Sequence, residues 1–395
     1  MFKSKSETPR GAGWEQHVRL QDGALMPLLG FGTQYGFTGD GHQRGSIACA
    51  ADYVALALHT GLRLADTARA YGTEAQVMSG IAQSGVERSD VFVVTKAWPG
   101  VDHIPDPQSS YSAIAESASR LGGYVDLFLV HQPVPGWQTL WRSLEQAKEA
   151  GLVRAIGVSN FNPAQLEELQ RFARYPATVN QILLHPFIYR DQAETLRYCA
   201  EHGIVVMAYP RCPWQLGLGT AFAELAAARG LTIVQVMLRW LVDHGCAVIP
   251  LSVNKQHLEE NLAVREFRLS AAELARLDKV ADREPLRYAI DEVNADYVAG
   301  WAFAACGIVS MQVLVDGTSV GRAIHGHHRP DVAAAYANKS GALESGFMFH
   351  FPAGALATPV CEVSISFKLA NGERVATAKT AVANLVDAPP AGSPQ

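Results

Sequence analysis

The sequence lacks several patterns that would assign it to a specialised class of protein. Its six cysteines are scattered and form no CxxC pair, which argues against a structural zinc site or a disulfide scaffold and fits a reducing cytosol. No apolar run approaches the length of a membrane span, and the polar start of the chain, Met1–Gly13, does not resemble a secretory signal. We therefore expect a cytoplasmic protein that does not enter a membrane.

Charge is also evenly spread. The formal net charge is −5, without a long run of like charge, and a nucleic-acid-binding protein would usually show a basic stripe. We therefore expect no nucleic-acid partner. What the sequence does contain is ordinary globular composition, with 48% hydrophobic and 18% charged residues in a chain of 395. That length predicts two domains.

The first part of the chain alternates short apolar runs with amphipathic segments. Each run is mostly apolar throughout, as in parallel strands buried on both faces. The segments between them have helical spacing; in Trp137–Ala150, for example, Leu140, Leu144 and Ala147 form one stripe. The eight runs are Leu28–Thr33, Leu62–Thr67, Val91–Ala97, Leu127–Gln132, Val153–Ser159, Thr178–His185, Ile204–Pro210 and Cys246–Ser252.

Eight strand-helix units in roughly 260 residues predict an α/β fold of the (β/α)8 TIM barrel type. A doubly wound sheet is the alternative, and it would require a G-x-G-x-x-G turn after the first strand. The segment Gly30–Gly36 has glycines at the wrong spacing for that turn. Before the first strand, His17–Pro27 predicts a hairpin around Asp22-Gly23, placed to plug one end of the barrel.

After about residue 284 the helical spacing gives way to alternation. Apolar residues recur at every second position in Val309–Val315 and in Phe347–Phe351, and Asp316-Gly317 and Asn371-Gly372 predict tight turns. Short strands with such turns predict an antiparallel β-sandwich. The expected organisation is a flexible N-terminus at 1–16, the barrel at 17–283, a linker at 284–298, the sandwich at 299–386 and a disordered tail at 387–395.

Polar residues stand where the predicted strands end, and in a TIM barrel catalytic groups occupy the carboxyl ends of strands. Asp66, Lys96 and His131 end the second, third and fourth strands, and Tyr71 follows in the loop after Asp66. An ammonium beside a phenol lowers the phenol's pKa, so Tyr71 could give a proton to a carbonyl oxygen while His131 orients that oxygen. Singly, each residue is more often a helix cap or surface group; together they favour catalysis.

Several segments carry a resemblance to a known family. They are Met26–Thr33, Gly61–Glu74, Gly157–Phe161, Val179–Gln181 and Ile249–Ser252, with Glu260-Asn261-Leu262 after them. In this order, over about 17–283, they resemble the motifs of the aldo-keto reductases. The resemblance implies an enzyme that passes a hydride from a nicotinamide cofactor to a small aldehyde or ketone.

The resemblance also implies roles for individual residues. Asp66, Tyr71, Lys96 and His131 match the catalytic tetrad of the family. Side chains that match cofactor contacts are Thr33, then Ser159, Asn160 and Gln181 for the nicotinamide carboxamide, Tyr209 for stacking on the nicotinamide ring, Ser252 for a phosphate, and Glu260 and Asn261 for the adenine. Without the surrounding motifs, Gln181 and Tyr209 would be interpreted as core residues.

Two departures from the family bear on the cofactor. The family usually has Lys and Arg, which grip the 2′-phosphate of NADP, where this chain has Leu251 and His257. Lys255 lies nearby in sequence as a substitute. We therefore expect NADP(H) by a narrow margin over NAD(H). After Tyr209 the usual Ser-Pro-Leu run is also missing, and we hypothesise that Arg211 contacts the pyrophosphate instead.

The sequence says little about the substrate. Tyr35, Trp98 and Trp137 follow the first, third and fourth strands, so they are expected to rim an apolar mouth suited to a ring or aliphatic carbonyl. Packing within loops is the alternative for all three.

The C-terminal region has a resemblance of its own. The segments Gly300–Ala302, Val313–Gly317, Arg329–Ala333 and Ser345–Phe347 are similar to an immunoglobulin-like module appended to some bacterial glycosyltransferases and methyltransferases. The resemblance implies a bacterial protein that has a protein or saccharide partner. His325, His327, His328 and Asp331 form a cluster that could bind a metal, but such a run is more often a solvated loop, so no metal is predicted.

Two other functions compete with an active reductase. The first is a scaffold or sensor that holds cofactor with little turnover and uses the sandwich to bind a partner. The second is a metal-dependent hydrolase on the same barrel, for which only His131 and Asp66 are candidate ligands. The complete set of four catalytic residues favours the reductase.

Overall fold

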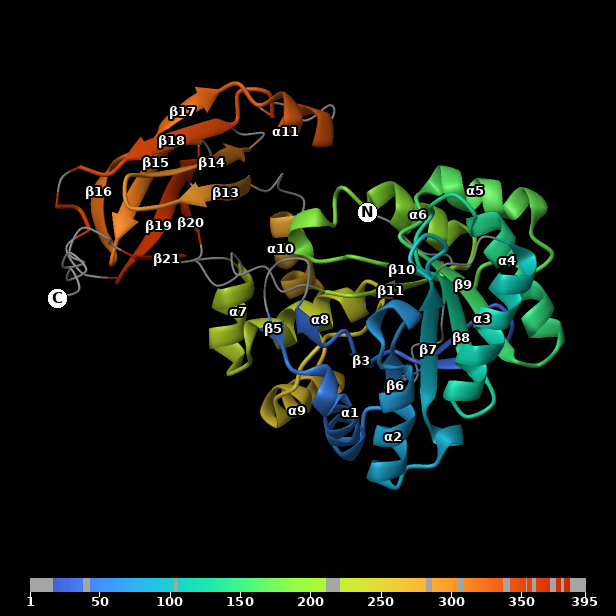
Figure 1. Cartoon of the computed structure of the whole chain (residues 1–395). Helices are drawn as coiled ribbons and strands as arrows, with labels where there is room; N and C mark the ends of the chain where they lie inside the picture. Colours follow the sequence, from blue (N-terminus) through green and yellow to red (C-terminus); the bar gives the residue numbers. More distant parts are fainter. Residues whose placement is uncertain are drawn as a thin grey trace, which may run out of the picture. The chain divides into compact units, whose positions relative to one another are not determined.

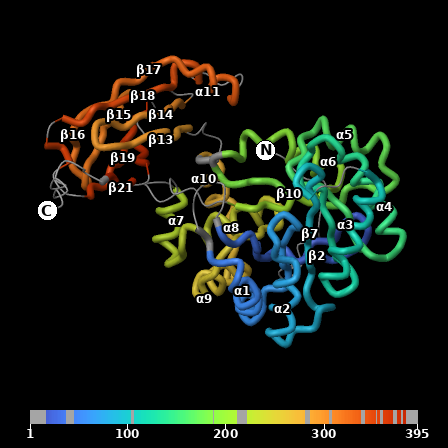
Figure 2. Tube along the Cα trace, viewed as in Figure 1, coloured from blue at the N-terminus to red at the C-terminus, as the bar shows by residue number. Residues whose placement is uncertain are grey.

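The computed structural model divides the chain into two compact units. Unit 1 comprises Met1–Cys212 and Glu224–Lys279, and unit 2 comprises Pro213–Ala223 and Val280–Gln395 (Figures 1 and 2). The residues that the structure describes are 17–37, 43–102, 106–210, 221–281, 286–304, 308–336, 342–352, 354–356, 360–369, 374–377 and 380–383. The predicted flexible N-terminus at 1–16 and disordered tail at 387–395 lie outside the described residues.

Unit 1 is built around a parallel sheet of eight strands in the order β3-β6-β7-β8-β9-β10-β11-β12. The sheet closes on itself, because Leu29 forms a parallel bridge with Val248 and the Gly30 amide donates to the Val248 carbonyl at 2.9 Å. The prediction of a (β/α)8 barrel is confirmed. The strands are β3 (Phe31–Gly32), β6 (Leu64–Asp66), β7 (Phe92–Ala97), β8 (Val125–Val130), β9 (Val153–Ser159), β10 (Val179–Ile182), β11 (Val205–Ala208) and β12 (Ala247–Val248).

Helices alternate with these strands along the chain, and their starts are well signalled. Asp106 and Asn162 each accept a backbone amide hydrogen bond in a capping box, with proline at the first helical position. The helices are α1 (Ala50–His59), α2 (Glu74–Ser84), α3 (Pro107–Arg120), α4 (Trp137–Glu149), α5 (Pro163–Phe172), α6 (Ala193–Glu201), α7 (Ala221–Arg229), α8 (Ile233–Asp243), α9 (Lys255–Ala263) and α10 (Ala271–Ala281). Short 3-10 turns lie at Ile47–Cys49, Arg69–Tyr71, Arg88–Asp90, Pro186–Ile188 and Val264–Glu266.

The predicted N-terminal hairpin is also present. Strands β1 (His17–Arg19) and β2 (Leu25–Pro27) pair antiparallel, and Gly23 in the turn has φ of +90°, which glycine adopts without strain. Leu20 and Met26 belong to one buried cluster with inward-facing strand residues such as Leu127 and Met207. The hairpin therefore plugs the barrel, and a further short pair, β4 (Gly36–Phe37) with β5 (Gln43–Arg44), follows β3.

Unit 2 contains two antiparallel sheets. One has the order β13-β14-β18-β17, and the other has the order β16-β15-β19-β20, with β21 also paired to β19. Buried side chains of both sheets, including Val298 and Phe347 of the first and Val313 and Ile365 of the second, belong to one hydrophobic cluster. The elements are β13 (Arg287–Val293), β14 (Tyr297–Phe303), β15 (Ile308–Val315), β16 (Thr318–Arg322), β17 (Ile324–His327), α11 (Pro330–Ala335), β18 (Gly346–His350), β19 (Val360–Leu369), β20 (Arg374–Ala376) and β21 (Thr380–Ala383).

The turn predicted in unit 2 is confirmed, but the predicted linker is not. Val315 pairs with Thr318 around Asp316 and Gly317, whose φ angles of 48° and 80° are those of a two-residue hairpin. The range 284–298 was predicted as a linker, whereas strand β13 and the start of β14 occupy most of it. A register shift between Ile290 and Glu292 interrupts the alternation that would have revealed β13. The turn Asn371-Gly372 lies outside the described residues.

No single helix among the described residues is both long and apolar enough to cross a membrane. The helices α7 and α8 pass that test only as a pair, bent by 107° at the break between them.

Candidate active site

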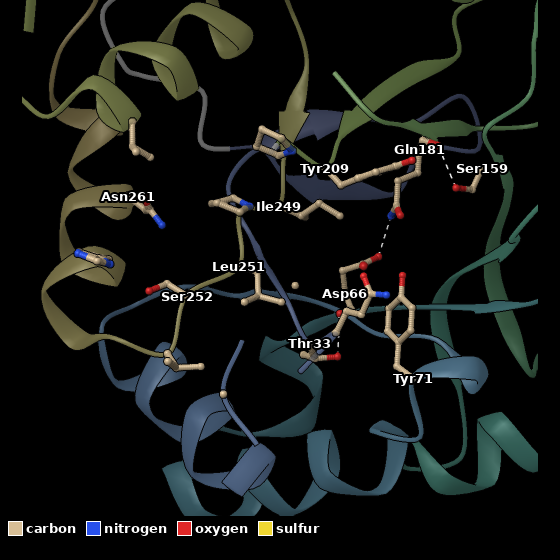
Figure 3. Close-up of a pocket in the computed structure, with 18 of the residues that line it drawn as sticks. Thr33, Asp66, Tyr71, Ser159, Gln181, Tyr209, Ile249, Leu251, Ser252 and Asn261 are labelled. Carbon is tan, nitrogen blue, oxygen red and sulfur yellow. Dashed lines mark hydrogen bonds between the residues drawn. The ribbon is translucent and has the colours of Figure 1, made fainter. Parts of the chain in front are cut away.

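A cavity of about 1030 Å³ opens at the carboxyl ends of the barrel strands. Figure 3 shows Asp66, Tyr71 and Gln181 at one end of it, and Ser252 and Asn261 at the other. Most of the predicted site residues line this cavity together, although they come from widely separated parts of the chain. They are Thr33, Asp66, Tyr71, Trp98, His131, Ser159, Asn160, Gln181, Tyr209, Ser252, His257, Glu260 and Asn261.

Lys96 lies beneath the cavity and is completely buried. Its Nζ donates to Oδ1 of Asp66 at 2.8 Å and to the Thr67 carbonyl at 2.9 Å, and it lies 4.9 Å from the centre of the Tyr71 ring. The strands β6 and β7 pair directly, so their carboxyl ends hold the carboxylate and the ammonium side by side. The arrangement is a buried ion pair in contact with a phenol.

The charges of this group support one another. Burial alone lowers the pKa of Lys96, but the charges of Asp66 and Tyr71 and hydrogen bonds to both raise that pKa above its usual value. Burial raises the pKa of Asp66 above its usual value, although Lys96 and a hydrogen bond from Gln181 act in the opposite direction. The ammonium of Lys96 is therefore held in its charged form, which stabilises negative charge on the oxygen of Tyr71.

His131 is neutral in this setting. Burial and the nearby charge of Lys96 lower the pKa of His131 to about 3. Its ring lies 5.6 Å from the ring of Tyr71 and 5.2 Å from that of Trp98, measured between centroids. Its buried Nδ1 has no hydrogen-bond partner among the described residues. A neutral imidazole at the cavity wall can bind a substrate oxygen without carrying charge to it.

A network of amides and hydroxyls lines the wall between β9 and β11. Ser159 Oγ donates to the Gln181 carbonyl at 2.9 Å, Asn160 Nδ2 donates to Ser159 Oγ at 3.0 Å, and the Tyr209 hydroxyl donates to Asn160 Oδ1 at 2.8 Å. Asn160 has φ of 64°, a conformation that asparagine adopts more readily than most residues. Gln181 Nε2 donates to Oδ2 of Asp66 at 2.7 Å and links this network to the ion pair.

Helix α9 forms the opposite end of the cavity. Asn254 caps it by accepting from the backbone amides of Gln256 and His257, and the Asn254 amide donates to Ser252 Oγ at 3.1 Å. Glu260 and the buried Asn261 face the cavity from the same helix. No lysine or arginine is present among the described residues that line the cavity, so this end can hold polar groups but offers little fixed positive charge.

Comparison with known proteins agrees with this geometry. The model of the aldo/keto reductase family matches residues 28–212 and 210–282. The chain belongs to the aldo/keto reductase family. An aldo-keto reductase of Mycolicibacterium vanbaalenii is 40% identical over 270 residues, which are 66% of this chain and 90% of that protein. Morphine 6-dehydrogenase of Pseudomonas putida is 36% identical over 287 residues, 68% of this chain and 92% of that protein.

Solved structures give the same result. An aldo/keto reductase from Brucella melitensis has a TM-score of 0.60 and 33% identity, covering 67% of this chain and 98% of its own. An aldo-keto reductase from Bombyx mori, solved in complex with NADP, has a TM-score of 0.60 and 29% identity, covering 69% of this chain and 96% of its own. This aldo/keto reductase is thus an oxidoreductase that reduces carbonyl compounds with NAD(P)H, and NADP(H) is the cofactor of its family.

The reductase does not bring all the predicted residues to the cavity. Trp137 is buried in α4 with its ring 5.0 Å from that of Phe161, so its predicted place at the substrate mouth is wrong. Tyr35 is only 4% exposed and packs on Tyr53 with 5.1 Å between ring centres. Its hydroxyl is buried without a partner among the described residues, so it too belongs to the packing rather than the rim.

Two predicted cofactor contacts, Lys255 and Arg211, are not among the described residues that line the cavity. Lys255 is exposed, its Nζ lies 3.5 Å from Oε1 of Glu259, and it is not among the described residues that line the cavity. It therefore does not substitute for the missing cation at Leu251. Arg211 lies outside the described residues, and its contact with a pyrophosphate stays a prediction.

The structure adds residues that the sequence did not single out. Val101 and Gln132 line the cavity at the end that holds Trp98, and Asn254 lines it at the α9 end. Asn254 carried a recognisable signal, since an asparagine just before an amphipathic segment is a typical helix cap. Val101 had no such signal in the sequence, because its position depends on how the loop after β7 folds back over the strand end.

No cluster of potential metal-binding side chains is found within the described parts of the reductase. In unit 2, His325 and His327 belong to strand β17, and His325 Nε2 forms a 2.8 Å hydrogen bond with the Ala302 carbonyl. The solvated loop that we predicted for these histidines is therefore partly a strand.

Proposed function

We propose that Tyr71 is the proton donor of the carbonyl reduction, and that Asp66, Lys96 and His131 prepare it for that role. The observation that carries this proposal is the buried ammonium of Lys96, held 2.8 Å from Asp66 Oδ1 and beside the Tyr71 ring. As the substrate oxygen gains negative charge it takes the phenol's proton, and Lys96 stabilises the phenolate left behind. Neutral His131 donates a hydrogen bond to the same oxygen and fixes its position.

The cavity fits a nicotinamide dinucleotide. Its volume lies at the upper end of the range typical of ligand pockets, which leaves space for a carbonyl substrate beside a cofactor. When bound, the nicotinamide supplies the hydride. Ser159, Asn160 and Gln181 would hold its carboxamide, and Tyr209, half-buried in the same wall, would stack on its ring. Thr33 and Ser252 would contact the remainder of the cofactor, with Glu260 and Asn261 toward its adenine.

The reductase should use NADH almost as well as NADPH. A 2′-phosphate carries negative charge that Lys or Arg usually balances, and Leu251 offers none. His257 is exposed on the first turn of α9 and provides at most one hydrogen bond when neutral. The amides at the start of α9 offer weak compensation through the helix dipole. These features favour NADP(H) by only a small margin.

For unit 2 we propose an immunoglobulin-like β-sandwich that binds a protein or saccharide partner. The shared hydrophobic cluster of the two sheets supports a sandwich, and the turn at Asp316-Gly317 supports the resemblance. The boundaries that we propose remain close to the sequence-based ones, with a barrel at 17–283, although the second domain begins at β13. A cytoplasmic location and a bacterial origin belong to the same proposal.

The roles at the active site are tested by a panel of aldehydes and ketones assayed with NADPH and NADH. Tyr71→Phe removes only the proton donor, so we expect kcat to fall by about 10²–10⁴-fold while cofactor affinity is retained. Tyr111→Phe, which makes the same change on α3 away from the cavity, should keep wild-type activity. Full turnover by Tyr71→Phe would refute the assignment of the acid.

The same panel distinguishes a reductase from a cofactor-binding scaffold. A scaffold would bind NADPH tightly, yet no carbonyl in the panel would cause loss of the reduced nicotinamide's absorbance.

Trp98 lies at the rim beside His131, so carbonyls with an aromatic or aliphatic body are expected to be the better substrates.

A further inference from the structure

The outer face of the β16-β15-β19-β20 sheet in unit 2 contains a small polar cavity of about 190 Å³ (Figure 1 shows the strands). The side chains that line it are Val309, Ser310, Gln312, Arg322, Ser366, Lys368 and Arg374. Six of these seven are polar or charged, and three of them are cations. We call this set the sheet-face cavity.

The strand register explains why these residues come together. Gln312 pairs with Arg322 on one side and with Ser366 on the other, and Lys368 pairs with both Ser310 and Arg374. The lining therefore forms two adjacent rows across four strands, with a cation from β16 at one side and cations from β19 and β20 at the other. Alternate residues in β15 and β19, such as Met311 and Phe367, point into the core.

Among the described residues, the three cations of this cavity have no acidic partner. Within the described parts of the chain, Arg322, Lys368 and Arg374 form no ion pair, and the lining contains no carboxylate. Arg329 of the same unit shows the contrast, since it is paired with both Asp291 and Asp331. A local excess of three positive charges on a chain whose net charge is −5 concentrates anions at this point.

We propose that the sheet-face cavity binds the phosphate monoester of a small polyol. Arginine side chains bind phosphate through two parallel hydrogen bonds and lysine binds it as a point charge. Ser310, Ser366 and Gln312 supply the neutral donors and acceptors that suit the hydroxyl groups of the ester's organic part. The cavity is too small for a large ligand, and its cations converge on one hollow instead of following a line, so a single phosphate group fits better than a polyanionic chain.

The test is calorimetric titration of the full-length protein with glycerol 3-phosphate, inorganic phosphate and glycerol, in the presence of saturating NAD⁺. The NAD⁺ fills the barrel cavity, so that phosphate binding there does not contribute, and it carries no phosphate monoester that would compete for the sheet-face cavity. We expect glycerol 3-phosphate to bind, inorganic phosphate to bind several-fold more weakly, and glycerol not to bind. Affinity should also fall as sodium chloride is raised, because the contacts are exposed ion pairs.

Three single variants, Arg322→Gln, Lys368→Gln and Arg374→Gln, should each weaken glycerol 3-phosphate binding about 10-fold. Arg171→Gln removes the same charge from the exposed face of α5 in unit 1 and should leave the affinity unchanged. Unchanged affinity in the three cavity variants would overturn the site. Equal affinity for inorganic phosphate and glycerol 3-phosphate would overturn the assignment to a phosphate monoester.

Discussion

The two units use lysine in opposite ways. In the barrel, Lys96 is fully buried and bonded to the Asp66 carboxylate and the Thr67 carbonyl. On the sheet face of unit 2, Lys368 is exposed and lines a cavity whose described lining contains two arginines and no acid. A charge that is paired and shielded from water is already positioned for a reaction, whereas exposed and unpaired charges are free to meet an external anion. The burial of a lysine and the presence of an acidic partner therefore distinguish a cation suited to catalysis from one suited to binding an anion.

Changing each lysine to methionine is the strongest test of this comparison. Lys96→Met leaves the Asp66 carboxylate buried without its partner, so the free energy of unfolding should fall by about 3–5 kcal/mol. Lys368→Met removes an exposed charge and should change that free energy by less than about 0.5 kcal/mol. Urea unfolding of both variants measures the difference.

Equal stabilities of the two variants would contradict the comparison. Because unit 1 and unit 2 could unfold separately, the transition should be followed by hydrogen exchange of β6 and β7 as well as by overall fluorescence. A loss confined to those strands would place the effect at the ion pair.

The pH dependence of stability gives a second test within the barrel. The pKa of His131 is lowered to about 3 by burial and by Lys96. Between the ordinary histidine pKa of about 6.5 and pH 3, the unfolded chain therefore binds a proton that the folded chain does not. Stability from this group is complete above pH 6.5 and is lost as the pH falls, by about 3 kcal/mol between pH 7 and pH 4.

His131→Gln removes the titrating ring and keeps a neutral donor. The variant should lose about 3 kcal/mol less stability than the wild type between those two pH values. The measurement is urea unfolding at pH 7 and pH 4. If both proteins lose the same amount, His131 is not held neutral by its surroundings, and the role we give it at the carbonyl oxygen fails.

Much of the barrel was predictable because its signals are local. Each strand is a short apolar run, and the residue that ends it has to face the same mouth in any (β/α)8 barrel, which is why Asp66, Lys96 and His131 could be placed from sequence. The place of Trp137 could not be predicted, because an aromatic side chain just after a strand can turn toward the barrel mouth or into the layer of helices. Its ring packs against Phe161 and Phe172, which are distant in sequence, and this contact places it in the helix layer.

Unit 2 was predictable where a turn requires special backbone angles and unpredictable elsewhere. Asp316-Gly317 identifies a hairpin because few residues tolerate positive φ. The sheet-face cavity left no sequence signal, since Arg322, Lys368 and Arg374 come from three strands that only the register brings together. Tertiary pairing, which a linear pattern does not contain, thus determines this site.

A lysine introduced at the α9 end of the barrel cavity should give that end an unpaired positive charge, as on the sheet face of unit 2. Leu251→Lys introduces an ammonium beside Ser252 and the first turn of α9, in a cavity where no lysine or arginine is found among the described lining residues. The 2′-phosphate of NADPH gains a partner there and NADH does not, so the ratio of kcat/KM for NADPH to that for NADH should rise about 10-fold, or 1.4 kcal/mol. Leu251→Met is the matched control of similar size and should leave the ratio unchanged. A rise in kcat/KM for both cofactors alike would show that residue 251 affects their common portion, and a fall for NADPH would place the phosphate elsewhere in the cavity.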